Sequence, residues 1–572
     1  MATEASSNAP YYLLNFERAL AWLAARYDDL LDENEHGFLR AFAALPQASR
    51  ALLVRMLMRK GTLFRTSRLS YDEIGCPVQA CAPLVELGWV DAEPPLTLDD
   101  LFALTTRPEL LLIFADAIAS IPSARSLRKQ DLLETLRPFY EAEGDAARPL
   151  AEWHAASTDS VLHVAVAPLC ERLRLMFFGN LQQDWSEFVL ADLGVFQYET
   201  VAFGPSSRAF QQRADVDVYL ALQACRDALE RLPDGESIGE LVAAVAAIDT
   251  ANPWLETRRA KLLFRIGQHC ERRRDWPAAL AVYADCAWPG ARHRRVRVFE
   301  QCERFDDAFA LASQAVAEPE SEEEAQRIAR MLPRLQRRRG EPVARTPAAR
   351  PVERSTLVLP RPQVAQPVEY AARDYLSRED APVHYVENAL INSLFGLLCW
   401  EPVFAALPGA FFHPFQRGPA DLHAPDFHAR RAEQFTACLA QLDSTAYRET
   451  ILRHLEVKAG VQSPFVFWGL LTPELIALAL DCLPAAHLKL WFERLLRDIR
   501  GNRSGLPDLI RFWPAEHRYE LIEVKGPGDR LQDNQIRWLA YCAQHGMPVR
   551  VLDVRWVDEA ATGPEGAEEA AA

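Results

Sequence analysis

Two short apolar segments near the C-terminal end of the 572-residue chain constrain its fold more than any other feature. Leu509 to Phe512 and Tyr519 to Val524 are rich in apolar and aromatic residues and are joined by a polar turn, so they predict two neighbouring strands. Because side chains alternate along a strand, we expect Glu523 and Lys525 on one face of the sheet and Val524 in the core.

The residue before the first strand adds a second carboxylate. Pro507 fixes the turn that leads into the strand and positions Asp508 at its start. Two neighbouring strands therefore bring Asp508, Glu523 and Lys525 together. Two carboxylates form a small hard-oxygen cation site, and a lysine beside it suits attack of water on a phosphodiester. The alternative is an ordinary surface ion pair on an edge hairpin, because a spaced motif is a hypothesis until its context is known.

The E-x-K triplet occurs twice, and its first copy serves as a control. Glu456-Val457-Lys458 follows Thr450 to Leu455, whose apolar spacing is helical, and no Pro-Asp strand precedes it. We interpret that copy as a solvated helix face. The copy at Glu523 differs because a Pro-Asp pair lies upstream and Gly-Pro-Gly follows.

The segments after Lys525 complete a known order of elements. Asp533 to Cys542 predicts an amphipathic helix that begins with an acid and is followed by Gly546. Val549 to Val554 predicts another strand. Strand, strand, helix, strand is the core of the restriction-endonuclease-like fold.

Three motifs resemble one nuclease family. They are G-L-P-D-L from Gly505, E-V-K-G-P-G-D-R-L from Glu523 and N-Q-x-x-W-L from Asn534. Together they are similar to the VRR-NUC (virus-type replication-repair nuclease) domain, and most of all to that of a bacterial Fanconi-associated nuclease. The resemblance implies a structure-selective endonuclease that incises 5′ flaps, with 5′-to-3′ exonuclease activity, in interstrand-crosslink repair. The cysteine-rich, ubiquitin-binding finger of animal members is not seen in this sequence, so recruitment by ubiquitin is not expected.

The family also implies an acidic residue upstream. Val383 to Trp400 predicts a helix with an apolar stripe that includes Leu390 and Leu394, and Glu387 lies on the same face. A buried carboxylate needs a partner, and a metal ion is one such partner. The alternative is a helix-start glutamate favoured by the macrodipole. The resemblance favours the metal, because Glu387 falls where the family has its first metal-binding carboxylate.

The expected cofactor is one or two Mg²⁺ or Mn²⁺ ions. Glu387, Asp508, Glu523 and the carbonyl of Val524 are the predicted ligands, and Lys525 is expected to orient or deprotonate the attacking water. Gln535, on the following helix, is either a supporting side chain of the same site or a solvated amide.

The net charge of −16 excludes a uniformly basic nucleic-acid coat, so local charge matters more. The eleven cysteines have no regular spacing, which indicates reduced thiols, and no membrane span or signal peptide is evident. We expect a bacterial cytoplasmic, nucleoid-associated protein that binds branched or flapped DNA and no membrane. A monomer is expected, with a DNA-dependent dimer as the alternative.

Two N-terminal segments carry candidate phosphate contacts. The loop from Arg59 to Arg68 contains an aromatic residue and four basic ones, and a second basic group begins the helix at Ser126 to Leu136. The alternative for the loop is a solvated turn. The candidates are Arg59, Lys60, Arg65, Arg68, Arg128 and Lys129.

Residues 150–335 predict helical repeats with a local excess of basic residues. The segments beginning at Glu271 and Glu303 each resemble the turn and second helix of a hairpin, at a spacing close to the tetratricopeptide period of ~34 residues. The segment from Glu256 to Glu300 contains eleven Lys or Arg residues and five acidic residues. This local excess of positive charge favours an anionic ligand such as DNA phosphate over a solvated helix face. The candidates are Arg258, Arg259, Lys261 and His293.

The predicted fold is therefore multidomain: a mainly α-helical N-terminal two-thirds with a SAP-like module and TPR-like repeats, followed by an α/β restriction-endonuclease-like VRR-NUC domain. The expected parts are an N-terminal helical segment (1–70), a SAP-like DNA-binding module (71–150), TPR-like repeats (151–340), a Pro/Arg-rich linker (341–368), the nuclease domain (369–557) and a disordered tail (558–572). Two other functions stay open: a Holliday-junction resolvase or restriction-type nuclease, and a non-enzymatic repair scaffold.

Overall fold

The computed structural model describes residues 10–119, 121, 124–141, 147–185, 196–233, 237–343, 351–362, 364 and 366–557. The predicted tail at 558–572 lies outside the described residues. The chain divides into two compact units: an N-terminal unit (residues 1–195 with 210–216) and a C-terminal unit (residues 196–209 with 217–572).

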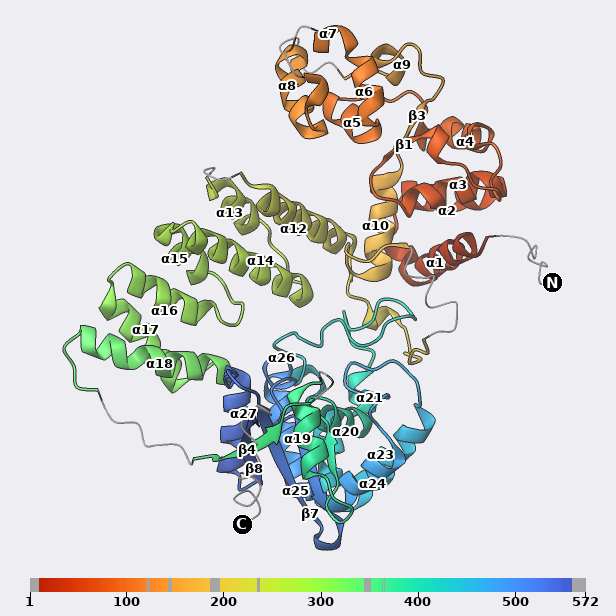
Figure 1. The fold of residues 1–572 in the computed structure, drawn as a ribbon. Coiled ribbons are helices and arrows are strands. Elements are labelled where there is room, and N and C mark those ends of the chain that lie inside the picture. Colours follow the sequence, from red (N-terminus) through yellow and green to blue (C-terminus); the bar gives the residue numbers. More distant parts are fainter. Residues whose placement is uncertain are drawn as a thin grey trace. The chain divides into compact units, whose positions relative to one another are not determined.

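Helices and one small sheet build the described part of the N-terminal unit (Figure 1). The antiparallel sheet has the order β1–β3–β2, and Phe64 of β1 pairs with Leu162 of β3. It therefore joins segments that are about a hundred residues apart in the chain. The elements are α1 (Tyr11–Tyr27), α2 (Glu33–Ala44), α3 (Gln47–Leu57), β1 (Leu63–Arg65), α4 (Pro77–Glu86), β2 (Val90–Asp91), α5 (Leu98–Leu104), α6 (Arg107–Ile113), α7 (Ala115–Ala119), α8 (Lys129–Glu141), α9 (Leu150–Trp153), β3 (Val161–Val164) and α10 (Ala167–Phe178).

The segment predicted as a SAP-like module has an apolar core of its own. Leu101 on α5, Leu110 on α6 and Leu136 on α8 are fully buried in it, together with Phe114. The helix predicted at Ser126 to Leu136 is present as α8, with a later start.

The predicted helical hairpins are present in the C-terminal unit. In the turns of both hairpins, Arg274 (φ 59°) and Glu303 (φ 57°) adopt the left-handed conformation, and the next amide donates to the carbonyl five residues earlier. Gly267 lets α14 and α15 approach closely, because a Cβ there would lie 2.4 Å from the ring of Tyr283. The helices are α12 (Arg213–Arg231), α13 (Gly239–Ala246), α14 (Pro253–Arg272), α15 (Trp276–Ala284), α16 (Ala291–Gln301), α17 (Phe305–Ala317) and α18 (Glu322–Arg338).

A five-stranded mixed sheet with the order β4–β8–β7–β6–β5, packed between helices, follows in the C-terminal unit. The strands are β4 (Glu353–Pro360), β5 (Val383–Tyr385), β6 (Leu509–Trp513), β7 (Arg518–Lys525) and β8 (Val549–Val557). β7 runs antiparallel to β6 and parallel to β8. The predicted chain order of strand, strand, helix and strand is confirmed, with the helix at Asp533–Gln544. Helix α19 (Val368–Leu376) covers one face through Ala371 and Ala372, against Val524 and Val554.

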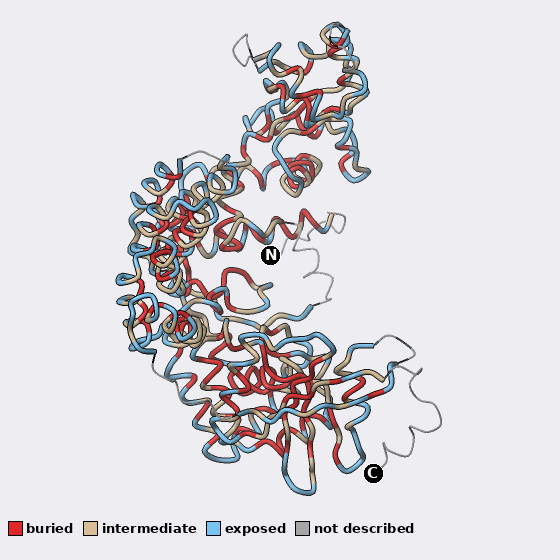
Figure 2. Tube along the Cα trace, turned by 60° about the vertical axis from the view of Figure 1, so that its left-hand side comes forward, coloured by how far each residue is buried: buried red, intermediate tan, exposed pale blue. Residues whose placement is uncertain are grey.

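Helices cover the other face of the sheet, where Ile510, Phe512 and Leu521 are buried. Figure 2 shows that buried residues concentrate around the sheet and these helices. Within the described residues no single helix has the length and hydropathy of a membrane span, and α24 and α25 meet that criterion only as a pair bent by 104°. The helices are α20 (Leu390–Leu398), α21 (Trp400–Val403), α22 (Ala432–Ala440), α23 (Ala446–Val457), α24 (Pro473–Cys482), α25 (Ala485–Arg497), α26 (Ile499–Asn502) and α27 (Asp533–Gln544).

Two predictions about this region are wrong. Glu353–Pro360 lies within the predicted linker, but it forms the edge strand β4, which pairs in parallel with β8. The helix predicted from Val383 to Trp400 begins only at Leu390, because Val383, His384 and Tyr385 form β5 and pair with β6. Branched and aromatic side chains suit a pleated edge, and pairing with β6 overrides the helical spacing.

Candidate active site

Asp508, Glu523 and Lys525 meet at the ends of β6 and β7, as predicted. Asp508 directly precedes Leu509, the first residue of β6, which pairs with Ile522 of β7. Asp508 Oδ2 accepts a hydrogen bond of 2.8 Å from the amide of Val524. The Lys525 Nζ lies 2.6 Å from Glu523 Oε1. Glu523 is fully buried, and Asp508 and Lys525 are each 8% exposed. Protein atoms, and not bulk water, therefore form most of the surroundings of all three side chains.

Glu387 reaches the same place from a turn instead of a helix. It follows β5 with a φ of 29°, a strained conformation for a residue with a side chain, and its amide donates to the carbonyl of Asp508 at 2.9 Å. Tyr385 Oη donates to Glu387 Oε2 at 2.5 Å, and Asn388 Nδ2 donates to Oε1 at 2.9 Å. Sequence reasoning missed Tyr385 and Asn388, whose contacts aim the carboxylate; the strand pattern of 383–385 was the available signal for Tyr385.

The loop that leads into Asp508 is locked between two asparagines. The amide of Leu506 donates to Asn388 Oδ1 at 3.1 Å, and Asn534 on α27 donates to Ser504 Oγ at 3.2 Å. Gly505 has a φ of 91°, and a Cβ there would lie 2.8 Å from the backbone of Asn534. The glycine of the G-L-P-D-L motif is therefore required for both its conformation and its close approach to α27.

Burial raises the pKa of both strand carboxyls. The pKa of Asp508 is raised to about 6, because desolvation and the charges of Glu369 and Glu387 outweigh the Val524 amide and Lys525. The pKa of Glu523 is raised to about 8 by desolvation and by Asp508, against the pull of Lys525. Two carboxyls that resist ionisation side by side form a site in which a cation restores the charged form.

The residues present fit a divalent cation. Both oxygens of Glu523 are buried: Oε1 contacts only the Lys525 ammonium, and Oε2 contacts no donor among the described residues. Carboxylate oxygens are the ligands that hard cations prefer. Across the described ranges, no three His, Cys, Asp or Glu side chains already surround a common point. Asp508 faces the Val524 amide, Glu523 faces Lys525, and Glu387 faces Tyr385 and Asn388, so binding an ion requires these contacts to rearrange.

Gln535 has a different contact from the predicted one. Its Oε1 accepts from the amide of Gln532 at 2.8 Å and closes a capping box at the start of α27. The same helix start holds Asn534 against the loop before Asp508. The observed contact of Gln535 is therefore with the start of its own helix, and a supporting role in the site stays a prediction.

Among the predicted phosphate contacts of the N-terminal unit, Arg65 has a structural role. Its Nε lies 2.7 Å from Asp159 and its Nη1 lies 2.6 Å from Glu109, with the side chain 12% exposed. Lys129 Nζ donates to the carbonyl of Thr105 at 2.8 Å, and Arg59 Nη1 donates to that of Arg68 at 3.1 Å. DNA binding by the exposed side chains stays a prediction: Arg59, Lys60, Arg68 and Arg128.

The predicted basic residues of the repeats gather on α14 and α16. The guanidinium of Arg258 lies over the rings of Trp254 and Tyr219, at 4.3 and 4.5 Å, while Arg259 pairs with Glu256 at 2.7 Å. Lys261 is exposed, and its pKa is lowered by desolvation and then by Arg265, Arg258 and Arg500. A lysine surrounded by like charges of this kind favours an anionic ligand.

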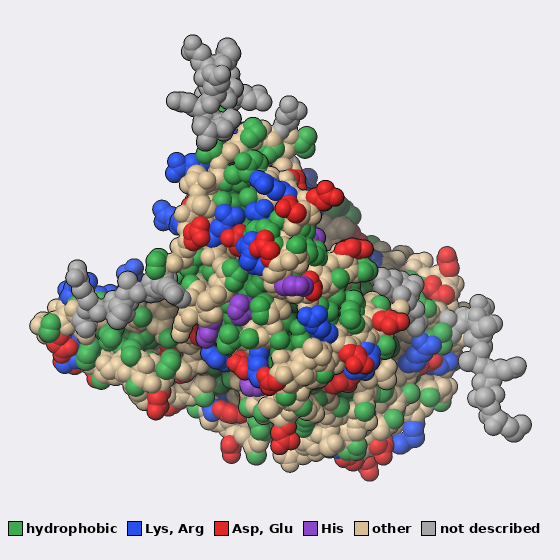
Figure 3. Space-filling model, turned by 90° about the horizontal axis from the view of Figure 1, so that it is seen from below, with side chains coloured by type: hydrophobic (Ala, Val, Ile, Leu, Met, Phe, Trp, Pro, Cys, Tyr) green, Lys and Arg blue, Asp and Glu red, His purple; other side chains and the backbone are tan. Residues whose placement is uncertain are grey.

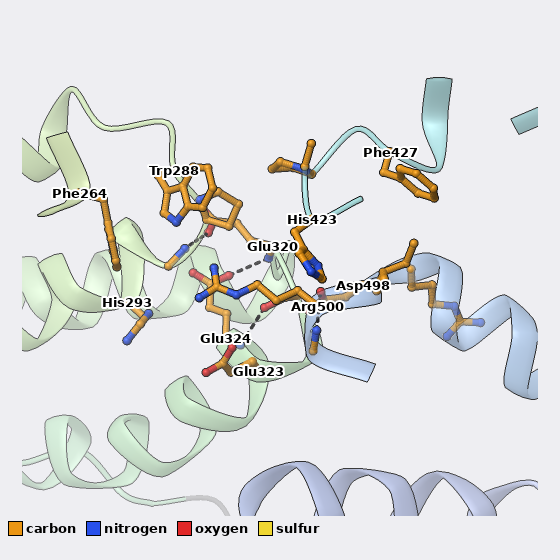
Figure 4. A pocket seen from close by; sticks show the side chains of 18 of the residues that line it. Phe264, Trp288, His293, Glu320, Glu323, Glu324, His423, Phe427, Asp498 and Arg500 are labelled. Carbon is orange, nitrogen blue, oxygen red and sulfur yellow. Dashed lines mark hydrogen bonds between the residues drawn. The ribbon is translucent and has the colours of Figure 1, made fainter. Parts of the chain in front are cut away.

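His293 lines a cavity of about 320 Å³ between the repeats and the sheet part of the same unit (Figure 4). Burial and the charges of Arg327 and Arg294 lower the pKa of His293 to about 4, and its Nε2 lies 2.9 Å from Arg327 Nη1. Arg500 lines the cavity from α26, eight residues before Asp508. Sequence reasoning missed Arg500, because only the fold brings α26 and α16 together.

Charge on the outer surface does not by itself mark a DNA path. On the face shown in Figure 3, basic and acidic side chains are interspersed. The mixed surface charge agrees with the net charge of −16. Candidate DNA contacts are therefore local groups, such as Lys261 and the residues of the His293 cavity.

The mixed sheet, the buried carboxylates and the adjacent lysine define a metal-dependent DNA nuclease with a restriction-endonuclease-like core. Family models agree with this class. The VRR-NUC domain matches residues 443–556, the FAN1 HTH domain matches residues 10–91, and the Fanconi anemia-associated nuclease SAP domain matches residues 95–153.

Similar proteins identify the family. A Fanconi-associated nuclease 1 homolog of Pseudomonas aeruginosa is 55% identical over 546 residues, which cover 96% of each chain. Homologs from Arabidopsis thaliana and Homo sapiens are 25% and 24% identical over 95% of this chain, which covers 67% and 62% of their lengths. Crystal structures of paFAN1 bound to 2-nucleotide and 1-nucleotide 5′-flap DNA with a gap are 54% identical, with TM-scores of 0.88 and 0.86; they cover 97% and 96% of this chain, which covers 100% and 99% of theirs. The chain belongs to the Fanconi-associated nucleases.

Proposed function

We propose that this protein is a 5′-flap endonuclease that also degrades DNA in the 5′-to-3′ direction and acts in interstrand-crosslink repair. The observation that carries the proposal is Glu523, which is fully buried beside Asp508: its Oε1 contacts only the Lys525 ammonium, and its Oε2 contacts no donor among the described residues. Its relatives with 5′-flap DNA bound supply the substrate class.

The proposed ligands are Glu387, Asp508, Glu523 and the Val524 carbonyl, and Mg²⁺ or Mn²⁺ is the proposed cation. When bound, the cation activates water and neutralises charge that develops on the phosphate. Lys525 Nζ then moves from Glu523 to hold the attacking water and to stabilise the same charge. Tyr385 and Asn388 keep Glu387 aimed at the site.

The repeats contribute the hold on the DNA end. Lys261 carries an ammonium group among Arg258, Arg265 and Arg500, so a phosphate of the flap strand relieves their mutual repulsion. His293 is neutral at pH 7 and lines the adjoining cavity, where it accepts from Arg327. These groups bind phosphates near the 5′ end, and they read charge and position and not sequence.

Two further statements complete the proposal. The protein acts as a monomer, and a dimer on DNA is the alternative that gel filtration with and without a flap oligonucleotide distinguishes. Its place of action is the bacterial cytoplasm at the nucleoid, where its DNA substrate lies.

The test is digestion of a labelled 5′ flap with Mg²⁺, Mn²⁺ or EDTA, by wild type and Asp508→Ala. Cutting near the junction by wild type with either metal, and none by the variant, is the expected result. A Holliday junction run alongside tests the resolvase alternative, which symmetric cutting of that junction and an intact flap would establish. Equal cutting by the Asp508→Ala protein contradicts the assigned active site.

A further inference from the structure

The last helix of the repeats, α18, lies beside α27, the helix that follows β7, and contacts it (Figure 1). Glu322, Gln326 and Arg330 are spaced four residues apart and therefore share one face of α18. Asp533 and Arg537 have the same spacing on α27. We call these five residues, with Arg494 of α25, the α18–α27 ladder.

The contacts of the ladder are polar and mutually specific. Arg330 binds Asp533 through two parallel bonds of 2.7 Å each. Arg537 Nη1 donates to Gln326 Oε1 at 2.7 Å, and Gln326 Nε2 lies 3.4 Å from the carbonyl of Asp533. Bidentate guanidinium–carboxylate pairs fix direction as well as distance, so the two helices have one preferred register.

Arg494 makes the third connection and is built into the core. Its side chain is 1% exposed and lies over Trp538 and Tyr541 of α27, at 4.2 and 4.4 Å. It donates to the carbonyl of Arg537 at 3.0 Å and to Glu322 of α18. A buried guanidinium needs its partners, so Glu322 is required at this point of α18.

The opposite face of α18 is attached to α16, which carries His293. Ile328, Met331 and Leu335 are buried against α16 and α17. Glu324 binds Arg292 of α16, and Arg327 contacts His293 itself. One helix thus connects the proposed DNA-end contacts to α27.

α27 in turn touches the loop that positions Asp508. Asn534, the residue after the ladder's Asp533, donates to Ser504 and packs against Gly505. The contacts from His293 to Asp508 therefore form a continuous series through α16, α18 and α27.

We propose that the α18–α27 ladder sets the cutting position: it fixes the distance from the DNA 5′ end to the metal site and so selects the phosphodiester bond that is cut. Gln326, Arg330, Asp533 and Arg537 are positioning residues. The inference rests on the proposed function, because a fixed distance has consequences only if the repeats hold the DNA end.

The experiment maps cut positions on a 5′-flap oligonucleotide labelled at the 3′ end of the cut strand, with full-length protein and Mn²⁺. Wild type should cut mainly at one bond. In Gln326→Ala/Arg330→Asp, the ratio of main-site to neighbouring cuts should fall about fivefold, because a bidentate pair and the amide contact are lost. Total cutting should remain near wild type, since Asp508, Glu523 and Lys525 are unchanged.

A charge exchange separates a specific pair from general damage. Asp533→Arg alone should spread the cuts, and the double variant Asp533→Arg/Arg330→Asp should restore the main site. The matched control is Arg304→Asp, which makes the same charge change in the exposed Arg304–Asp307 pair at the start of α17 and should leave the pattern unchanged. Melting temperatures confirm that the proteins are folded.

The outcomes are distinct. Spread cuts with rescue by the charge exchange support the inference. An unchanged pattern in the folded ladder variants overturns it, as does uniformly weaker DNA binding with the same main cut. Wild type that cuts at no fixed distance from the 5′ end overturns the end-holding role proposed for the repeats, and this inference with it, while the active-site assignment stands.

Discussion

Two clusters of carboxylates in this protein, one buried and one partly exposed, have opposite electrostatics. Desolvation raises the pKa of Asp508 to about 6 and that of Glu523 to about 8. In the N-terminal unit desolvation acts in the same direction on Asp159, but hydrogen bonds from Ser67, Thr66 and Arg65 outweigh it and lower its pKa well below the usual range. The difference lies in the hydrogen-bond donors: Asp159 accepts from several, whereas Glu523 Oε1 contacts only Lys525 and its Oε2 contacts no donor among the described residues. A satisfied cluster stabilises the fold, and an unsatisfied one awaits a ligand.

The first way to test this contrast is the same substitution in both clusters, beginning with Asp508→Asn. Cleavage of a labelled flap should fall by about 10³-fold or more, because the cation loses a charged ligand. The metal-free protein should melt at the same temperature or higher, since the amide replaces a carboxyl that is costly to ionise.

Glu520→Gln is the matched control for that variant. Glu520 lies three residues before Glu523 on β7 and contacts Arg550 away from the site, so this variant should retain activity. If Asp508→Asn fails to fold in EDTA, the Asp508 carboxylate stabilises the fold. That result would contradict the proposed difference between the two clusters.

Asp159→Asn should have the opposite effect. The exchange breaks a nearly buried ion pair with Arg65 and should lower the local free energy of unfolding by about 3 kcal/mol. Hydrogen exchange of the β1 and β3 amides measures this locally, which matters in a chain of several domains. Nuclease activity at low temperature should persist; unchanged exchange would mean that Asp159 does not stabilise the sheet.

Sequence reasoning located strands β6 and β7 because their signals are local. Strand alternation, Pro507 before Asp508 and the helix from Asp533 all act within about forty residues. β4 was missed because its partner β8 lies almost two hundred residues away, and parallel pairing over that distance leaves no local pattern. The prolines on either side of β4 therefore predict a linker there, and no local pattern opposes that prediction.

The position of Glu387 shows the same limit at shorter range. Its place among the metal ligands was predicted from the family resemblance, but on a helix, because an apolar run such as 383–400 is compatible with helix and strand alike. Pairing of β5 with β6 decides between them and puts Glu387 in a strained turn. Arg65 is a further case: a basic loop residue reads as a phosphate contact until the fold brings Glu109 and Asp159 to it.

The third test is the pH dependence of metal-free protein. Carboxyls with a raised pKa in the folded state bind protons that the unfolded chain has released, so stability falls as the pH rises from about 4 to about 8. Between pH 5 and pH 8 in EDTA, Asp508 and Glu523 should cost the C-terminal unit about 2 kcal/mol or more. Hydrogen exchange of β6 and β7 measures the trend.

Saturating Mg²⁺ should remove most of that dependence, because the cation stabilises the ionised carboxylates. Glu523→Gln should flatten it without metal. A trend of the opposite sign, with greater stability at pH 8 in EDTA, would mean that Lys525 satisfies the pair and that the site is an internal ion pair.

The smallest expected effect is acid loss of stability at Glu109 in the N-terminal unit. Desolvation alone would raise the pKa of Glu109. Hydrogen bonds from Thr106 and Arg65 have a larger effect in the opposite direction, so the pKa is lowered to about 2. A carboxyl with a lowered folded pKa stabilises the protein fully above its usual pKa, and the contribution is lost as the pH falls from about 4.5 towards 2. Because the side chain is 28% exposed, solvent reduces the contribution to about 1 kcal/mol. Exchange at β1 and β3 should therefore quicken between pH 5 and pH 3 in wild type and less in Glu109→Gln, whereas Asp99→Asn, in the exposed Arg137–Asp99 pair, should follow wild type. Identical pH profiles for wild type and Glu109→Gln would leave Asp159 alone as the partner that holds Arg65.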